Sequence, residues 1–504
     1  MTLARTQAIA LAGLEGSLID IEVDVSNGLP AYSLLGLPDA TLNEARDRIR
    51  AAILNSGYRW PNQKVTVSLS PAWLPKSGSA FDLPIAIAIL VASGQLEHSR
   101  ITDLFFVGEL SLEGSLRSIR GLLPILISAK RIGISKVIVP NDSINEAGVV
   151  SGIDITALPN LKSVVKHLNG DLVYESPNFF ELEFAESSKD LSEVAGHREA
   201  KFALEVLAAG RHNLLMIGPP GTGKTMLAER IPSILPPLSK DEAIDVAGIH
   251  SIAGALKQDQ ISCAPPFIAP HHATTIPALV GGGGVVIKPG SCSLAHNGVL
   301  FIDEAPECGS GILDALRQPM EAGYVTISRA NNNAKFPAKF ILVLAANPCP
   351  CGKFSGRGRG CQCSSLQVRR YLGKLSGPLL DRVDIRIKVE APSRADLSGG
   401  FGESSRSIRE RVIAAREIAS NRFAEYGFQT NSQIPPNLLR GKFRATRDAM
   451  ALLSDLLDRD FISARSFHRL LRVAWSIADL SKVEVPGRPE VERAITLRSG
   501  LENE

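Results

Sequence analysis

The hydrophobic and polar positions divide the 504-residue chain into three structured blocks. Residues 1–168 alternate strand-like runs, such as IDIEVDV and KVTVSLS, with helix-like stretches such as LNEARDRIRAAILNSG, which predicts an α/β domain. The acidic, irregular segment 169–189 indicates a linker. A second pattern of strands and helices fills 190–392, and 393–504 is mainly helical after a glycine- and serine-rich loop. The pattern therefore predicts an α/β multidomain protein with a helical C-terminal domain.

Composition narrows the class of protein. Apolar residues make up 44% and charged residues 21% of the chain, as in ordinary globular proteins. The net charge of +3 gives no overall nucleic-acid signal, so any basic surface must be local. The longest apolar run, LPIAIAILVA, is too short to cross a bilayer, and the N-terminus lacks a clear cleavage signal. We expect a cytoplasmic protein with no membrane partner, in which the seven cysteines do not form structural disulfides.

The segment LLMIGPPGTGKT carries the strongest chemical signal. An apolar strand over 214–217 runs into a glycine-rich loop and then into a helix-like pattern, which is the context that a phosphate-binding loop needs. Glycines let backbone N–H groups close around phosphates, Lys224 neutralises the β- and γ-phosphates, and Thr225 offers a hydroxyl to Mg²⁺. The expected nucleotide-binding residues are Gly218, Pro219, Pro220, Gly221, Thr222, Gly223, Lys224 and Thr225.

Two later strands end in residues that suit hydrolysis. The strand in NGVLFIDE ends in Asp303, placed to hold Mg²⁺, and Glu304, placed to orient and deprotonate the attacking water. Without the upstream loop, these would be two solvated carboxylates at a strand end. The strand in KFILVLAANP ends at Asn347, which either contacts the γ-phosphate or water, or only caps the turn before Pro348.

Four of the seven cysteines lie close together after this strand, as Cys349, Cys351, Cys361 and Cys363. Four converging thiolates suit tetrahedral Zn²⁺, although one residue within each pair is less than the usual spacing in zinc ribbons. A redox pair would need C-x-x-C near a helix N-terminus, which is absent. The remaining alternative is four free thiols on a loop, and the pattern favours zinc over it.

Together these motifs resemble the AAA+ ATPases. More narrowly, APHHATTIPALVGGG, PGSCSLAHNGVLFIDE and NPCPCG resemble the magnesium-chelatase-like family called YifB or ComM, over nearly the whole chain. The resemblance implies ATP as the nucleotide, a homo-hexameric ring, and Asn347 as the sensor-1 residue. It implies that Arg382, in LLDRVD, is an arginine finger for a neighbour's ATP, and that Arg465, in SARSF, is the sensor-2 arginine of the helical lid. The residues alone also allow Arg382 to pair with Asp381 or Asp384, and Arg465 to form a surface salt bridge.

The first 168 residues resemble the proteolytic domain of the Lon family. PKSGSAFDLPIAIAIL matches the stretch that carries the Lon serine, and GELSLEGSLRSIRGLLPILISAKRIGISKVIVP matches the stretch that carries its lysine. The expected serine position is Ala80 and the expected lysine position is Leu123. Because a serine–lysine dyad needs both a hydroxyl and an amine, we expect the fold to persist without the peptidase chemistry.

The resemblance also places inserted hairpins at the pore of the ring, and GYVTISRANNNAKFPAKF has the turn residues of a hairpin. From Arg329 to Lys388 the chain has twelve Lys or Arg residues against two Asp residues, which suits contact with a phosphate backbone. A solvated basic face that includes the arginine finger would explain part of this excess. The expected DNA-binding residues are Lys288, Arg329, Lys335, Arg357 and Arg359.

These observations favour a hexameric, Mg²⁺-dependent ATP-driven motor that acts as a helicase or branch-migration factor on single-stranded or branched recombination intermediates. Two alternatives remain: a magnesium-chelatase-like subunit for metal insertion, and an ATP-driven protein remodeller without protease activity. The adjacent His271 and His272 are expected to pack around the base of an insert, since neighbours on a strand do not face the same side.

Overall fold

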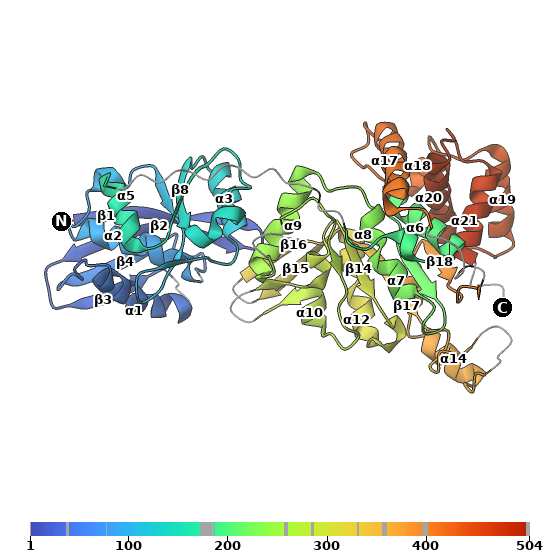
Figure 1. Cartoon of the computed structure of the whole chain (residues 1–504), viewed down its shortest axis with the longest axis horizontal. Helices are drawn as coiled ribbons and strands as arrows, with labels where there is room; N and C mark the ends of the chain where they lie inside the picture. The colour runs from blue at the N-terminus through green and yellow to red at the C-terminus, as the bar shows by residue number, and fades with distance from the viewer. Residues whose placement is uncertain are drawn as a thin grey trace.

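The computed structural model describes residues 2–36, 40–76, 78–171, 184, 187–256, 261–283, 287–329, 332–354, 360–394, 396 and 402–499. The molecule is elongated, with an N-terminal α/β domain, a central α/β core and a C-terminal helical domain following one another, and with the two termini at opposite ends (Figure 1). The predicted α/β multidomain fold is confirmed. In the described part of the chain, no helix combines the length and apolar character that a membrane span requires.

The N-terminal domain is built on a four-stranded sheet with the order β1-β2-β4-β3. Along β2 the side chains from Ile19 to Val25 are buried at every second position, which is the alternation of a strand with one covered face. Helix α2 is buried along its whole length, so the apolar run LPIAIAILVA forms the domain core. These elements are β1 (Thr2–Ala12), β2 (Glu15–Ser26), β3 (Ala31–Leu35), α1 (Ala40–Asn55), β4 (Lys64–Ser70) and α2 (Asp82–Ala92).

A second, three-stranded parallel sheet with the order β5-β8-β9 completes this domain. Helix α3 begins after Gly121, which has φ 80°, and its apolar face packs between the two sheets and the central core. These elements are β5 (Leu104–Phe106), β6 (Glu109–Leu110), β7 (Leu116–Arg117), α3 (Leu122–Arg131), β8 (Lys136–Pro140), α4 (Ile144–Ala147), β9 (Asp154–Leu158) and α5 (Leu161–Asn169).

The central core is a five-stranded parallel sheet with the order β11-β14-β17-β10-β18. All six residues of β17 are buried, as expected for a strand covered on both faces. The strands are β10 (Leu214–Ile217), β11 (Phe267–Ile268), β14 (Val299–Ile302), β17 (Ile341–Ala346) and β18 (Ile385–Lys388). The helices around them include α6 (Arg198–Gly210), α7 (Lys224–Glu229), α8 (Ile231–Ile234), α9 (Lys240–Ala253), α10 (Ile276–Val280), α11 (Ser291–Leu294), α12 (Ser310–Ala315), α13 (Arg317–Ala322), α14 (Ser365–Leu372) and α15 (Gly377–Leu380).

Two small antiparallel pairs project from this core toward the N-terminal domain. One is β12 (Gly281–Gly282) with β13 (Lys288–Pro289), and the other is the expected hairpin of β15 (Tyr324–Arg329) with β16 (Asn332–Pro337). The turn between β1 and β2 reaches this hairpin, because a side chain at Gly13 would come within 2.5 Å of the Lys335 carbonyl oxygen. The hairpin is therefore held from the side by the N-terminal domain.

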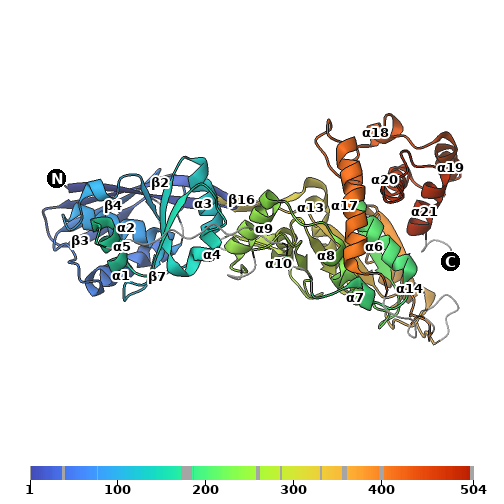
Figure 2. The ribbon, with the colours of Figure 1, turned by 45° about the horizontal axis from the view of Figure 1, so that its top comes forward.

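The C-terminal domain is a group of helices that stands beside α6 of the core (Figure 2). Its helices are α17 (Ser405–Arg422), α18 (Pro436–Arg440), α19 (Arg447–Asp458), α20 (Ala464–Leu480) and α21 (Arg488–Ser499). It is tied to the core at Asp384, whose buried carboxylate pairs with Arg469 of α20 and lies 3.4 Å from His212 Nδ1. Arg469 and His212 hold the pKa of Asp384 well below its usual range despite its burial. Arg498 of α21 donates to the Val383 carbonyl oxygen at 2.7 Å, so two helices of the C-terminal domain contact the loop that precedes β18.

The N-terminal domain and the core meet where α3 packs on α9. The half-buried carboxylate of Glu146 accepts hydrogen bonds from the Ser251 hydroxyl at 2.5 Å and from the Leu123 N–H at 3.0 Å. The same Ser251 hydroxyl accepts a hydrogen bond from the Gly121 N–H at 3.0 Å. Burial raises the pKa of Glu146, because the low-polarity surroundings disfavour its charged form.

This joint predicts a difference between two substitutions of Glu146. Glu146→Leu leaves the Leu123 N–H without an acceptor and should lower the free energy of unfolding by about 1–3 kcal/mol in urea denaturation. Glu146→Gln keeps an oxygen acceptor and should lower it less. Since the pKa of Glu146 is raised in the folded protein, its contribution to stability declines as pH rises from the ordinary carboxyl range through the raised value. That decline should be missing in Glu146→Gln, and equal pH profiles would contradict the assignment.

Candidate ATP site and cysteine cluster

The phosphate-binding loop connects the end of β10 to the start of α7. Lys224 folds over the loop, and its amine donates to the carbonyl oxygens of Gly218 at 2.6 Å and Pro219 at 2.9 Å. Gly223 has φ 85°, a conformation that favours glycine, and a side chain at Gly218 would meet the Val389 carbonyl oxygen at 2.1 Å. The loop conformation therefore depends on its glycines, as the sequence predicts for a backbone that closes on phosphate.

The two expected Mg²⁺ ligands meet at this loop. The Thr225 hydroxyl donates to a carboxylate oxygen of Asp303 at 2.7 Å, which brings the end of β14 to the start of α7. A hydroxyl and a carboxylate on one spot are the oxygen donors that Mg²⁺ prefers, so the residues present fit this ion. Burial lowers the pKa of Lys224, and the nearby carboxylates of Asp303 and Glu304 oppose that effect. A positively charged amine and two carboxylates thus face the same space.

Glu304 adopts a left-handed backbone conformation with φ 48°, and its N–H donates to Asp303 Oδ1 at 2.9 Å. Such a conformation costs energy for a residue other than glycine and is common at functional sites. The half-exposed Glu304 carboxylate lies 3.6 Å from Nδ1 of His272. The sequence predicts that His272 packs around the base of an insert, whereas the structure places it beside the expected general base. The only signal for this was its position in the motif APHHATTIPALVGGG.

Asn347 lies beside Lys224 at the end of β17, where its side-chain oxygen accepts a hydrogen bond from the lysine amine at 3.2 Å. Asn347 therefore lies beside the lysine that is expected to contact the phosphates. Its neighbour Tyr371, on α14, is 4% exposed, and burial together with Glu307 and Glu304 raises its pKa to about 12. The hydroxyl of Tyr371 consequently stays protonated at neutral pH. No pattern in the sequence pointed to this tyrosine.

Arg382 and Arg465 lie at the opposite edge of the sheet. The loop follows β10, whereas Arg382 precedes β18, and the two strands run parallel in register from Leu214 beside Ile385. A four-residue strand, about 13 Å long, therefore lies between these arginines and the phosphate loop of the same chain. Within the chain, Arg382 pairs with Glu321, and Arg465 lies 3.2 Å from Asp381.

The four cysteines converge into one cluster. The sulfur of Cys349 lies 3.3 Å from that of Cys351 and 3.7 Å from that of Cys361, and all four sulfurs, with Cys363, lie within 4.8 Å of one another. Zn–S bonds of about 2.3 Å in a tetrahedron give sulfur separations of about 3.8 Å, so this donor set fits Zn²⁺. All seven cysteines of the chain are free of disulfides, and the three others, Cys263, Cys292 and Cys308, lie elsewhere.

The cysteine cluster rests directly on the phosphate-binding loop. Gly352, within the turn that carries Cys349 and Cys351, is so close to Pro220 that an added side chain would come within 2.5 Å of its ring. The cluster also begins two residues after Asn347. The loop that the sequence presented as a separate feature is therefore part of the wall of the nucleotide site.

The remaining predicted positions lie in the N-terminal half and the inserts. Ala80 lines a cavity and Leu123 is fully buried, and both pack on one apolar cluster, so neither supplies peptidase chemistry. The Lys335 amine lies 3.9 Å from the centre of the Tyr324 ring on the exposed hairpin. Arg329 ends β15 of the same hairpin, and Lys288 lines the cavity near Ala80. Arg357 and Arg359 lie outside the described residues.

Fold and site together define a magnesium-chelatase-type AAA+ ATPase. Residues 190–397 match the family of magnesium chelatase, subunit ChlI, while residues 21–143 and 402–498 match two further ChlI families, the second of which is the ChlI C-terminal family. ATP and Mg²⁺ are the ligands that this class implies: Lys224 and the loop amides would hold the phosphates, and Thr225 with Asp303 would hold the ion. The bound ion supplies positive charge that offsets the negative charge of the phosphates.

Full-length relatives narrow the family further. The chain is 46% identical to an uncharacterized protein of Mycobacterium tuberculosis, over 99% of each chain. It is 41% identical to competence protein ComM of Haemophilus influenzae, over 99% of this chain and 98% of that one, and 41% identical to YifB of Escherichia coli, over 99% and 97%. The protein belongs to the YifB/ComM family of magnesium-chelatase-like ATPases.

Proposed function

We propose that this protein is an ATP-hydrolysing motor that works as a homo-hexameric ring and moves along DNA. The ring is supported by one observation: the residues predicted to act on ATP are divided between the two edges of one sheet. Lys224, Glu304 and Asn347 gather at the carboxyl edge, and Arg382 and Arg465 lie at the amino edge. In a ring, the amino edge of one copy faces the phosphate loop of the next, so each copy completes its neighbour's site.

The physical advantage of this division is that hydrolysis depends on contact between subunits. An arginine that enters from a neighbour stabilises the negative charge on the transferring phosphate, and a trans arginine is worth about 10³–10⁵ in rate. Asp381, Asp384 and Arg469 form one network with these arginines, because Asp381 lies beside Arg465, Asp384 pairs with Arg469, and Arg469 donates to the Arg382 carbonyl oxygen. The lid helix α20 is part of that network, so its position is coupled to the nucleotide of the next copy.

Mixing two inactive variants tests this arrangement. Arg382→Ala and Lys224→Ala should each lower the ATPase rate by about 10³-fold or more, because one lacks the finger and the other lacks the phosphate contact. An equimolar mixture should regain activity, since a Lys224→Ala copy can supply its arginine to the intact loop of an Arg382→Ala copy. Arg465→Ala should be rescued in the same way, and Arg459→Ala, an exposed lid arginine, should be active alone. No recovery on mixing would mean that the arginines act within their own chain.

DNA is the substrate that we propose for the motor. The region from Arg329 to Lys388 has an excess of ten basic residues, and Lys335 lies on an exposed hairpin among them. One full-length relative is named a competence protein, whereas the similarity to the ChlI subunit of Euglena gracilis covers only 52% of this chain. We therefore favour single-stranded or branched recombination intermediates over metal insertion, with helicase or branch-migration activity as the outcome of hydrolysis.

We predict that the β15–β16 hairpin contributes a measurable part of the affinity for DNA. Lys335→Gln should weaken binding to forked DNA uniformly across sequences and lower the slope of log affinity against log salt by about one, because one phosphate contact is lost. Forked DNA should also raise the ATPase rate of the wild-type protein. Lys162→Gln, which removes an exposed lysine from α5, is the matched control. A DNA-independent ATPase rate together with an unchanged salt slope would refute the DNA proposal.

We further propose that Cys349, Cys351, Cys361 and Cys363 hold one structural Zn²⁺. The ion would fix the turn at Gly352 that supports Pro220 of the phosphate loop. Elemental analysis of purified protein should give about one zinc per chain, as a closed four-thiolate site binds it tightly. Cys361→Ser should lower that content and Cys263→Ser should not. Substoichiometric zinc that neither substitution changes would leave the four thiols as free cysteines.

A further inference from the structure

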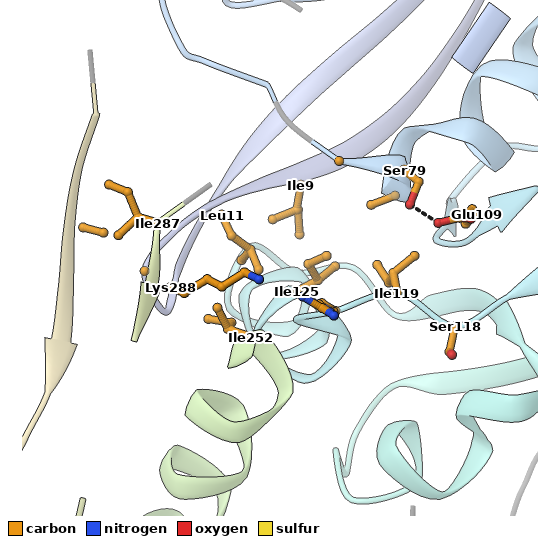
Figure 3. A pocket seen from close by; sticks show the side chains of 15 residues that line it. Ile9, Leu11, Ser79, Glu109, Ser118, Ile119, Ile125, Ile252, Ile287 and Lys288 are labelled. Carbon is orange, nitrogen blue, oxygen red and sulfur yellow. Dashed lines mark hydrogen bonds between the residues drawn. The ribbon is translucent and has the colours of Figure 1, made fainter. Parts of the chain in front are cut away.

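A cavity of about 560 Å³ lies between the N-terminal domain and the ATPase core (Figure 3). It is separate from the phosphate loop and contains none of the residues assigned to ATP or zinc. One wall comes from β1 and the loop before α2, and the other comes from α9, β13 and β16. Its size falls in the range of pockets that enclose a ligand.

About half of the cavity wall is apolar, and most of this apolar part comes from aliphatic side chains. Ile9 and Ile125 of the N-terminal domain are 3% exposed, and their side chains point toward the open space together with Leu11 (Figure 3). The core contributes two more isoleucines from separate elements. The six aliphatic lining residues are Ile9, Leu11, Ile119, Ile125, Ile252 and Ile287. Such a wall favours a ligand with an aliphatic body.

The cavity also contains polar and charged groups. At one end the Ser79 hydroxyl donates to the carboxylate of Glu109 (Figure 3). Two exposed cations also line the cavity: Lys288, whose side chain extends from β13 past Leu11 (Figure 3), and Arg120, whose guanidinium lies against Gly254 at the end of α9. Neither side chain forms a hydrogen bond or ion pair with the part of the chain that the structure describes. Two cations without a partner beside aliphatic side chains favour a ligand with an anionic terminus.

The strand β1 adds a third feature. In the described sheet it pairs only with β2, so its outer edge has no strand partner, and its residues Ile9 and Leu11 border the cavity, with Gly13 just beyond its end. An unpaired edge offers backbone N–H and C=O groups in a row, which an extended peptide satisfies better than a flexible hydrocarbon chain does. The polar end at Ser79 and Glu109 offers further hydrogen-bonding groups to peptide amides.

From these features we propose that the cavity binds an extended peptide that has aliphatic side chains and ends in a carboxylate, which Arg120 and Lys288 hold. Ala80 and Leu123 supply neither the hydroxyl nor the amine of a dyad, so the peptide is bound and not cleaved. The site would recruit a partner protein through its C-terminus, and its ligand would contact the N-terminal domain and the ATPase core together. This binding site goes beyond the motor function and does not require DNA.

Fluorescence polarisation with the full-length protein tests the proposal, without ATP or DNA. The probe is fluorescein-labelled Gly-Ser-Gly-Ile-Val-Leu with a free C-terminal carboxylate, compared with the same peptide as a C-terminal amide. The acid should bind saturably, and the amide about tenfold more weakly, because the charge-assisted contacts are lost. Arg120→Gln and Lys288→Gln should each weaken the acid by about tenfold and leave the amide unchanged. Arg117→Gln, which removes an exposed arginine outside the cavity lining, should change neither.

Two further arms make the outcome decisive. Ile119→Ser should weaken both peptides, and circular dichroism melting curves establish that each variant is folded. Equal binding of acid and amide to the wild-type protein overturns the assignment of the cations without the need for any variant. Binding of decanoate, measured by calorimetry, with no binding of the peptide would show a fatty-acid site and overturn the proposal. Because the assay contains neither ATP nor DNA, its failure is distinguishable from a failure of the motor proposal.

Discussion

The direction of the strands in the central sheet is the constraint on which the rest of the structure depends. Because all five strands are parallel, every carboxyl end lies at one edge, and the loop after β10, the carboxylates after β14 and Asn347 after β17 meet there. Because β18 runs in the same direction, the residues just before it, including Arg382, lie at the opposite edge. In the ring that we propose, one subunit carries two complementary halves of a site that it does not close by itself. In that proposal, the direction of the strands determines which edge of one copy faces the next.

The loop before β18, which carries Arg382, is fixed in place by Asp384. This buried carboxylate is neutralised by Arg469 of α20 and lies beside His212 of the core. A buried charge of this kind is stable only with its partners in place, so the lid cannot shift far without cost. Arg498 adds a second lid helix by donating to the backbone of Val383. The loop that carries Arg382 is therefore joined to the lid, and in the proposed ring a nucleotide bound next to that loop would also affect the lid.

The sequence predicts contacts between neighbouring residues better than contacts between segments that are distant along the chain. The strand, loop and helix around Lys224 are contiguous, so spacing alone indicated the phosphate loop, and the alternation of patterns indicated an α/β multidomain fold. The thiols of Cys349 and Cys363 are also near in sequence, and the structure brings them together as expected. The contacts of His272 with Glu304 and of Gly352 with Pro220 join positions that are 32 and 132 residues apart in the sequence. Such contacts come from the packing of elements on a sheet, and neither periodicity nor motif spacing carries that information.

In the N-terminal domain, Leu123 is part of the contact with the ATPase core. Leu123, at the position where the resemblance to the Lon proteolytic domain implies a lysine, is fully buried, and its N–H donates to Glu146, which also accepts a hydrogen bond from Ser251 of α9. A lysine there would place an unpaired ammonium in an apolar cluster, which costs several kcal/mol unless the amine loses its charge. Leucine instead extends the core across the domain boundary. Since α9 follows the phosphate loop through α7 and α8, this joint connects a helix close in sequence to the nucleotide site with the N-terminal domain by noncovalent contacts.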